Sequence, residues 1–364
     1  MNTYKLLTPG PLTTTETVKA EMLVDRCTWD DDYKSVTQKI RRELLALGAV
    51  KEDAYTSVLM QGSGSFGVEA ALTSVIGKDG KCLFAINGEY GRRMVTIAQY
   101  AGLNHLVYAA AFDEIPSVAV IKDYLEKDGD ITHIAMVHCE TTTGILNPLD
   151  DVAAIAKQYG KIFIVDAMSS FGGIPINIGA LGVDFLISSA NKCIQGVPGF
   201  SFIIARTDEL EKCRGIARSL SLDLYDQWAA MRKDGKWRFT SPTHVVAAFA
   251  KALDELEAEG GIRARYERYK ANNALLRKKM KDMGFTAYLE EKVQSPIITT
   301  FLFPAPDFNF PGFYGYVKNR GFVLYPGKLT EVDTFRVGNI GEIYQDDIEK
   351  LCAVIKDYME GKNK

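Results

Sequence analysis

Residues that bind metals or form disulfides are scarce in this chain of 364 residues. It contains only four histidines and six scattered cysteines, and no two cysteines form a C-x-x-C pair. We therefore expect reduced structural thiols in a cytoplasmic protein. His133 and His138 are the closest histidine pair. Five residues apart on one predicted strand, they point to opposite faces, so we expect no metal site.

Long apolar runs and a strong excess of one charge are also missing. No run of eighteen apolar residues occurs, so we expect no transmembrane helix. Residues 1–15 carry one lysine and no apolar core of the kind found in secretory signals, so we expect no signal peptide. A formal net charge of −3 argues against nucleic-acid or anionic-membrane partners, which favour a basic surface.

Short apolar runs do alternate with helical patterns between about residues 55 and 205. Such alternation indicates crossover units and a mostly parallel sheet covered on both faces, with ligands beyond the carboxyl ends of the strands. The predicted strands are Ser57–Met60, Lys81–Ile86, His133–His138, Lys161–Val165, Val183–Ile187 and Phe200–Ala205. The predicted helices are Phe66–Ile76, Gly91–Ala101, Ile115–Leu125 and Val152–Tyr159.

The pattern changes after about residue 245 to long helices and a few short strands. The helices are Val245–Glu259, Ile262–Met283 and Gln345–Met359, and the strands are Pro296–Phe303, Phe322–Tyr325 and Thr334–Val337. We therefore expect an α/β fold with a large domain over residues 16–245 and a smaller C-terminal α+β domain over residues 246–364. Residues 1–15 are expected to contribute to the active site or to the small domain.

Two polar residues at predicted strand ends are the strongest candidates for a catalytic role. Asp166 follows the buried run Ile162–Val165, and Lys192 follows the next run, Val183–Ile187. An aspartate at one strand end and a lysine at the next is the arrangement that a pyridoxal-phosphate enzyme needs. The lysine binds the cofactor through a Schiff base, and the aspartate keeps the pyridine nitrogen protonated. The alternative is an ordinary surface lysine after a strand.

A glycine- and serine-rich turn precedes the first predicted helix. Its residues Ser63, Gly64 and Ser65 combine backbone that can approach an anion closely, free N–H groups of a helix start and two hydroxyls. This composition predicts a cradle for the cofactor phosphate. No lysine follows as in a nucleotide-binding P-loop, and an ordinary turn with a serine N-cap is the alternative.

Two further strand ends and one apolar strand offer ligands for the cofactor or substrate. Tyr90 is placed to stack on a pyridine ring, and Arg93, or its neighbour Arg92, to bind a substrate anion. A hydroxyl of the Thr141–Thr143 run, with Thr142 as our choice, is placed to bind the phenolic oxygen of the cofactor. Arg336 lies in an apolar strand and suits a carboxylate. The alternative for Tyr90 is packing in the core, and for the two arginines it is an exposed helix face. The threonines could instead form a turn, and Arg336 could instead form a structural salt bridge.

Taken together, these segments resemble the class-V aminotransferases of the fold-type-I pyridoxal-phosphate enzymes. The most specific matches are Ile164–Gly173, Ser188–Gly196 and Lys236–His244, and the likeness runs from Leu7–Pro11 to Phe335–Gly341. The resemblance implies a large domain with a mostly parallel, seven-stranded type of sheet. It also implies an obligate homodimer with shared active sites.

The resemblance also assigns roles residue by residue. Lys192 and Asp166 correspond to the catalytic pair, and Ser63, Gly64, Ser65 and Asn191 to the residues that hold the cofactor phosphate. Tyr90 corresponds to the stacking aromatic, and Thr240 to the residue that reaches the cofactor of the other subunit. Arg336 corresponds to the residue that binds the keto-acid carboxylate. Arg93 is the expected phosphonate anchor, with Thr8 and Gly10 contributing backbone donors.

The activity implied by the resemblance is transfer of the amino group of 2-aminoethylphosphonate to pyruvate, a reaction of phosphonate catabolism that gives phosphonoacetaldehyde and L-alanine. Alanine–glyoxylate and serine–pyruvate transamination are the near alternatives, because they share the cofactor chemistry and differ in the amine donor. A desulfurase would need a mobile cysteine, for which Cys193 is the close candidate. In an extended segment its side chain would point away from Lys192. A non-catalytic binding protein would not need both the lysine and the aspartate.

Overall fold

A seven-stranded sheet forms the centre of the protein in the computed structural model, which describes residues 4–329 and 332–361. Its strands, in spatial order, are β2 (Tyr55–Gln61), β10 (Phe200–Arg206), β9 (Phe185–Ser189), β8 (Ile162–Asp166), β5 (His133–Val137), β3 (Lys81–Ile86) and β4 (Asn104–Ala109). Strand β10 runs antiparallel to both of its neighbours, and every other pairing is parallel. The expected mostly parallel sheet is thereby confirmed. Its central strands are almost wholly buried, which explains their nearly continuous apolar sequences.

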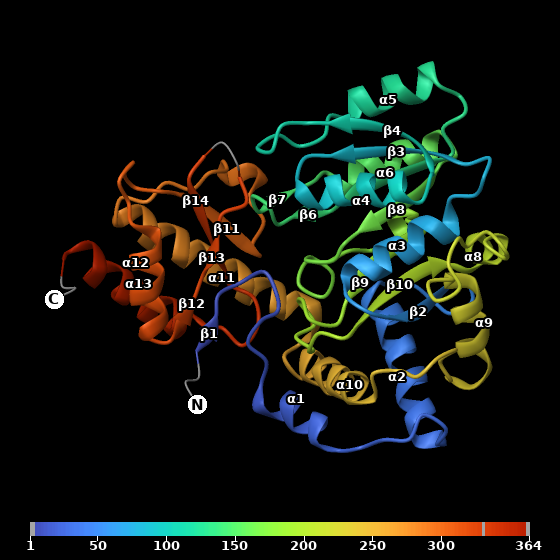
Figure 1. Ribbon diagram of the computed structural model, residues 1–364, viewed down its shortest axis with the longest axis horizontal. Coiled ribbons are helices and arrows are strands. Elements are labelled where there is room, and N and C mark those ends of the chain that lie inside the picture. The colour runs from blue at the N-terminus through green and yellow to red at the C-terminus, as the bar shows by residue number, and fades with distance from the viewer. Residues whose placement is uncertain (1–3, 330–331, 362–364) are drawn as a thin grey trace.

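Helices cover both faces of this sheet (Figure 1). They are α2 (Asp31–Leu47), α3 (Gly64–Val75), α4 (Glu89–Tyr100), α5 (Val118–Lys127), α6 (Leu149–Gln158), α7 (Ile178–Leu181), α8 (Thr207–Lys212), α9 (Leu224–Asp234) and α10 (Thr243–Ala258). Strand β10 shows which helices oppose each other. The side chain of Ser201 meets Gly67 of α3, whereas Phe200 and Phe202 stack edge-on or tilted against Phe249 of α10. Because side chains alternate along a strand, α3 and α10 lie on opposite faces.

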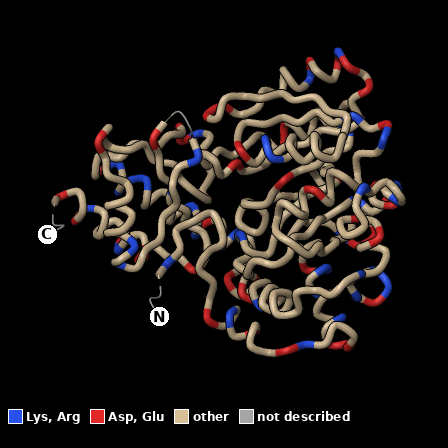
Figure 2. Tube along the Cα trace, viewed as in Figure 1, with Lys and Arg blue, Asp and Glu red and all other residues tan. Residues whose placement is uncertain are grey.

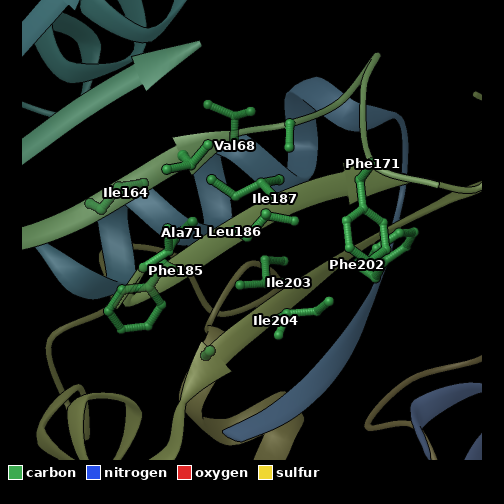
Figure 3. Packing of buried hydrophobic residues seen from close by; sticks show 14 of the residues in the cluster. Val68, Ala71, Ile164, Phe171, Phe185, Leu186, Ile187, Phe202, Ile203 and Ile204 are labelled. Atoms are coloured by element: carbon green, nitrogen blue, oxygen red, sulfur yellow. The ribbon is translucent and has the colours of Figure 1, made fainter. Parts of the chain in front are cut away.

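The core under α3 is built from aliphatic residues of the helix and the strands. Figure 3 shows Val68 and Ala71 of α3 beside Ile187 and Ile164 of the neighbouring strands. Gly67 permits this close approach, since a Cβ there would lie 2.4 Å from the Ser201 hydroxyl. The carboxyl ends of β8 and β9 are therefore held on a rigid, fully packed base.

A smaller α+β body packs beside the large one, on the left of Figure 1. It contains α11 (Gly261–Asp282), the 3-10 helix Glu291–Val293, β11 (Ile298–Leu302), α12 (Phe310–Asn319), β12 (Phe322–Val323), β13 (Tyr325–Pro326), β14 (Thr334–Gly338) and α13 (Gln345–Met359). Strands β11, β14 and β13 form an antiparallel sheet over a separate, phenylalanine-rich hydrophobic cluster. Helix α10 instead contributes to the cluster of the large body. The contacts of the large body thus extend beyond residue 245, where the sequence analysis places the domain boundary.

The N-terminal segment joins the two bodies. Strand β1 (Lys5–Leu6) pairs in parallel with β12, and Leu7 is buried in the hydrophobic cluster of the small body. The chain then crosses to the large body, where α1 (Glu16–Ala20) and the 3-10 helix Glu21–Leu23 pack against α10. Residues 1–3, at the start of the predicted N-terminal segment, lie outside the described residues.

Several observed elements were not predicted from the sequence, among them the helices α1, α7, α8 and α12 and the strand β1. Helix α2, strand β4 and helix α9 have no counterpart among the predicted elements. The single strand predicted over Phe322–Tyr325 is divided into β12 and β13, which join different sheets. A short connecting strand pair, β6 (Cys139–Glu140) with β7 (Ile145–Leu146), follows β5.

Figure 2 shows charged residues of both signs scattered over both bodies, with few in the central strands. This distribution agrees with the small net charge of the sequence. In the described part of the chain, no helix is long and apolar enough to cross a bilayer.

Candidate active site

The carboxyl ends of β8 and β9 bring the two predicted catalytic residues to one cavity. Asp166 is the last residue of β8, and Lys192 follows three residues after the parallel neighbour β9. The cavity has a volume of about 560 Å³. Its polar and charged lining residues are Ser63, Ser65, Tyr90, Arg93, Asp166, Ser189, Asn191 and Lys192.

Lys192 is held by the main chain of the N-terminal segment. Its Nζ donates hydrogen bonds to the carbonyl oxygens of Pro9, at 2.9 Å, and Gly10, at 3.3 Å. Burial lowers the pKa of the Lys192 ammonium, and the nearby positive charge of Lys328 lowers it further. An amine of lowered pKa is more readily available as a nucleophile and base.

Gly10 lies in close contact with the same lysine. Its φ of +113° is a conformation that glycine adopts without strain. A Cβ at this position would lie 2.6 Å from Cδ and 2.8 Å from Nζ of Lys192. Thr8 shapes this turn, because its hydroxyl donates to the carbonyl of Pro11. Pro9 and Gly10 therefore cover the lysine through their backbone, and Thr8 and Gly10 both remain predictions as substrate ligands.

Asp166 is a buried carboxylate that faces the cavity. Its Oδ1 accepts a hydrogen bond from the backbone N–H of Met168 at 2.8 Å. Burial raises the pKa of Asp166 to about 6, the nearby Glu140 carboxylate adds to the rise, and Lys192 and Arg93 oppose it. A carboxylate in this environment favours a cationic group opposite it, such as a protonated ring nitrogen.

The turn before α3 has the properties of an anion cradle. Ser63 is the N-cap of α3, but its side chain makes no capping hydrogen bond, so the hydroxyl is available to a ligand. The first N–H groups of a helix have no partner within it and point outward. A Cβ at Gly64 would lie 2.4 Å from the sulfur of Met168, so the turn packs directly on the segment after Asp166.

Cations surround the aromatic ring of Tyr90. The Arg93 guanidinium lies 5.0 Å from the ring centroid and Lys328 Nζ lies 4.3 Å from it. Lys328 also donates to the Tyr90 hydroxyl at 3.2 Å. Burial alone would raise the pKa of the phenol, but the charges of Lys328 and Lys192, together with the Thr141 side chain, hold it below its ordinary value. Sequence analysis did not identify Lys328, which lies in the small body.

Arg336 lies next to Tyr90 and is not itself among the residues that line the cavity. It is 1% exposed and donates to the carbonyls of Thr141, at 2.8 Å, and Pro326, at 3.0 Å. In the described part of the chain, no ion pair includes Arg336, which argues against the alternative of a structural salt bridge. A buried guanidinium without a carboxylate partner suits a substrate anion.

Glu140 holds the segment around Tyr90 in place, and sequence reasoning did not single it out. Its Oε2 accepts from the N–H groups of Tyr90 and Gly91, both at 3.1 Å. Its Oε1 accepts from the N–H of Thr142 at 3.1 Å and from the Thr142 hydroxyl at 2.7 Å. The Thr142 hydroxyl, predicted to bind the cofactor, is thus engaged with Glu140, while Thr141 interacts with Tyr90.

The remaining predicted residues occupy different surroundings. Asn191 lines the cavity and its Oδ1 accepts from the Ser189 hydroxyl at 3.1 Å. Thr240 is exposed and is not among the residues that line the cavity, so its predicted role requires a second subunit. The Cys193 thiol is fully buried and donates to the carbonyl of Ser169. Burial raises its pKa to about 12, which is unsuited to the mobile nucleophile of a desulfurase.

No cluster of three or more potential metal-binding side chains occurs in residues 4–329 and 332–361. The two histidines considered above instead bond to hydroxyls. His133 contacts Thr132 at 2.6 Å, and His138 contacts Ser170 at 3.0 Å.

Comparison with known sequences finds similarity over the full length. Residues 52–310 match the family aminotransferase class-V. The 2-aminoethylphosphonate–pyruvate transaminase of Lysinibacillus sphaericus (strain C3-41) is 62% identical over 363 residues, covering 100% of this chain and 99% of that protein. The protein of the same name from Bacillus mycoides (strain KBAB4) is 58% identical over 355 residues, covering 97% of each.

Solved structures share the fold at much lower sequence identity. An alanine–glyoxylate aminotransferase from Nostoc sp. superposes with a TM-score of 0.90 at 22% identity, covering 98% of this chain and 95% of the other. A pyridoxamine–pyruvate aminotransferase from Mesorhizobium loti gives 0.89 at 22% identity, covering 100% and 93%. At these identities the likeness shows the architecture alone.

Proposed function

The chain belongs to the class-V aminotransferases, and from this we propose that it transfers the amino group of 2-aminoethylphosphonate to pyruvate with pyridoxal phosphate as cofactor. The observation that carries the substrate assignment is the 62% identity to a transaminase of that name over the whole chain. The products would be phosphonoacetaldehyde and L-alanine. Ping-pong kinetics follow, because one product leaves before the second substrate binds.

The donor set of the cavity fits pyridoxal phosphate. Ser63 and Ser65, with the start of α3, offer hydroxyl and N–H groups to a phosphate. The Asp166 carboxylate faces the cavity as a partner for a protonated ring nitrogen, and Tyr90 provides an aromatic face. When bound, this cofactor supplies an electron-withdrawing ring that stabilises negative charge developing on the substrate carbon.

The residues of this chain supply the proton transfers and the orientation. The Lys192 amine, with its lowered pKa, is suited to take a proton from the substrate carbon that bears the amino group and to return it at C4′ of the cofactor. Asp166 keeps a negative charge opposite the ring nitrogen. Arg336, fixed by two carbonyls, orients the keto-acid carboxylate.

A homodimer with shared active sites completes the proposal. Two large side chains next to predicted cofactor residues are exposed: Phe66, which follows Ser65, is 52% exposed, and Phe239, which precedes Thr240, is 50% exposed. A second subunit over this face would bury both aromatic rings and bring its Thr240 to the cavity of the first. Sedimentation or light scattering measures the assembly directly.

A single-turnover absorbance experiment tests the activity. The cofactor-loaded protein is mixed, without keto acid, with 2-aminoethylphosphonate, L-alanine, L-serine or glycine in separate reactions. Conversion of the bound cofactor to its pyridoxamine form by the aminophosphonate, but not by serine, is the expected result. Conversion by serine or glycine but not by the phosphonate would transfer the assignment to another class-V activity.

A further inference from the structure

Three cationic side chains meet at Tyr90, but they approach from different sides. Arg93 is carried by α4 of the large body, whereas Lys328 and Arg336 come from the small body. A phosphonate dianion needs two positive charges to neutralise it, whereas a carboxylate monoanion needs one. The proposed reaction uses both, since its amine donor carries a phosphonate and its acceptor a carboxylate.

Arg93 is directed toward the cofactor side of the cavity. Its guanidinium donates to the Ser65 hydroxyl at 3.1 Å. Ser65 belongs to the turn that fits the cofactor phosphate, and the charge of Arg93 also acts on Asp166. Arg93 is therefore better placed to neutralise the cofactor than to bind the phosphonate of the substrate.

Lys328 and Arg336 instead belong to one hairpin. Tyr325 of β13 pairs with Arg336 of β14, and the Gly327 N–H donates to the carbonyl of Thr334 at 3.0 Å. This pairing places Lys328 just past the end of β13, on the hairpin that carries Arg336. Both side chains interact with the Tyr90 hydroxyl, Lys328 at 3.2 Å. They thus converge on the hydroxyl of Tyr90, a residue that lines the cavity.

The two cations differ in how they are held. Arg336 is buried and fixed by the carbonyls of Thr141 and Pro326, so its position does not change between substrates. Lys328 is half-buried on a flexible four-carbon stem, and its ammonium makes a hydrogen bond and a cation–π contact with Tyr90. In the part of the chain that the structure describes, no carboxylate forms an ion pair with it. Its ammonium is therefore free to turn from the Tyr90 hydroxyl to an incoming anion.

We propose that Lys328 selects a phosphonate over a carboxylate, an inference that rests on the function proposed above. Arg336 supplies one positive charge to either substrate anion. A phosphonate, like a phosphate ester, carries close to two negative charges at neutral and higher pH, and Lys328 supplies the second positive charge. A carboxylate carries one charge and leaves the Lys328 ammonium on the Tyr90 hydroxyl.

The test compares two half-reactions of the same cofactor-loaded enzyme. Conversion of the bound cofactor by 2-aminoethylphosphonate and by L-alanine is measured in the wild type and in Lys328→Met. We expect the ratio of kcat/KM for the phosphonate to kcat/KM for alanine to fall at least about tenfold, the effect of losing one close charge pair. Lys328→Arg, which keeps the charge, should restore most of the ratio. Lys328→Gln replaces the methionine variant if that variant does not fold.

Inhibition by small anions gives a second readout that does not require turnover of the phosphonate. At a pH above the second pKa of methylphosphonate, its inhibition constant against L-alanine should rise at least about tenfold in Lys328→Met, while that of acetate changes much less. Lys278→Met, at an exposed position on α11, is the matched control and should leave both constants unchanged.

Three outcomes would overturn the inference. Equal losses for the phosphonate and alanine would show that Lys328 acts through Tyr90 or the fold. An unchanged kcat/KM for both substrates in Lys328→Met would show that Lys328 does not contribute to substrate binding. If Arg93→Met lowers kcat/KM for the phosphonate selectively and Lys328→Met does not, Arg93 is the residue that binds the phosphonate. A wild-type enzyme that does not react with 2-aminoethylphosphonate at all would instead reject the proposed function, independently of any Lys328 variant.

Discussion

The Nζ of Lys192 lies 2.9 Å from the main-chain oxygen of Pro9, although 183 positions separate the two residues in the sequence. The contact joins the strand-end lysine of the large body to a segment that is itself anchored, through β1, in the small body. The surroundings of the catalytic amine therefore depend on how the two bodies pack. Four predictions follow from this site in addition to the Lys328 test.

Gly10→Ala should displace Lys192. The new Cβ would lie 2.6 Å from the lysine Cδ, and φ of +113° is strained for alanine. We expect turnover to fall at least about tenfold and unfolding free energy to fall by about 1–3 kcal/mol. The control is Gly160→Ala, where φ is also positive but no atom lies within 4 Å of the new Cβ. Equal activity in the two variants would contradict the close contact.

Lys192→Ala should abolish turnover, because it removes both the group that binds the cofactor covalently and the base. We expect kcat to fall at least about a thousandfold while the unfolding midpoint stays near that of the wild type. Borohydride reduction followed by mass spectrometry should attach the cofactor to the wild type and not to the variant. Lys122→Ala, at an exposed site on α5, is the control. Normal turnover in the Lys192 variant would exclude the proposed role.

Asp166→Asn should have opposite effects on stability and activity. The pKa of Asp166 is raised to about 6, so the folded cofactor-free protein binds this proton more tightly than the unfolded chain does. Its stability should therefore decline as pH rises from about 4 to about 6. Above that window the asparagine variant should be about 2–3 kcal/mol more stable than the wild type, and below pH about 4 the difference should vanish.

Urea unfolding of the cofactor-free protein across this pH range measures the effect of Asp166. Asp79→Asn, at an exposed position, is the control and should not change the pH dependence. In the cofactor-loaded enzyme, Asp166→Asn should lower kcat about a hundredfold or more, because the charge opposite the ring nitrogen is lost. If Asp166→Asn is no more stable than the wild type at pH 8, burial of the Asp166 charge does not destabilise the folded protein as predicted.

Glu140→Gln should loosen the segment that carries Tyr90. Glu140 accepts four hydrogen bonds, two at each oxygen, and a glutamine must turn its NH2 group toward at least one backbone N–H. We expect a loss of about 2–4 kcal/mol in unfolding free energy and a fall in turnover as Tyr90 is released. Glu69→Gln, exposed on α3, serves as the reference. An unfolding curve that superposes on that of the wild type would argue against this role.

Local patterns predicted which residues lie at the strand ends, but not which residues of the small body meet them. Asp166 and Lys192 each follow a buried apolar strand, so a few residues of sequence place them at the same edge of the sheet. Lys328 meets Tyr90 only because the hairpin of β13 and β14 packs against the large body. Which side chain faces an interface between domains depends on packing angles that no short pattern contains. For the same reason, sequence reasoning considered Arg93 as the phosphonate anchor and did not consider Lys328.

The missed elements have different physical causes. Helix α2 has an acidic first turn and buried residues at Ile40, Leu44 and Leu45, a signal that helical periodicity could have found. Strand β4 is an edge strand whose residues are all exposed or half-buried, unlike those of its buried neighbours. Its sequence nevertheless contains the apolar run Leu106–Ala109, a strand signal that the predictions did not use. The sequence also does not determine which threonine of the Thr141–Thr143 run faces the cavity. The choice depends on the buried Glu140, which binds the Thr142 hydroxyl.

The pairing of Lys5 with Phe322 in β1 and β12 sets the order in which the enzyme is completed. On the ribosome, the N-terminal segment is made first but has no partner strand until nearly all of the chain has been translated. The sheet of the large body can form earlier, and with it the ends of β8 and β9. The carbonyls of Pro9 and Gly10 reach the Lys192 amine only when β1 docks on β12. A nascent or truncated chain would therefore contain Lys192 without these two hydrogen bonds. Catalytic activity would therefore report complete folding of both bodies.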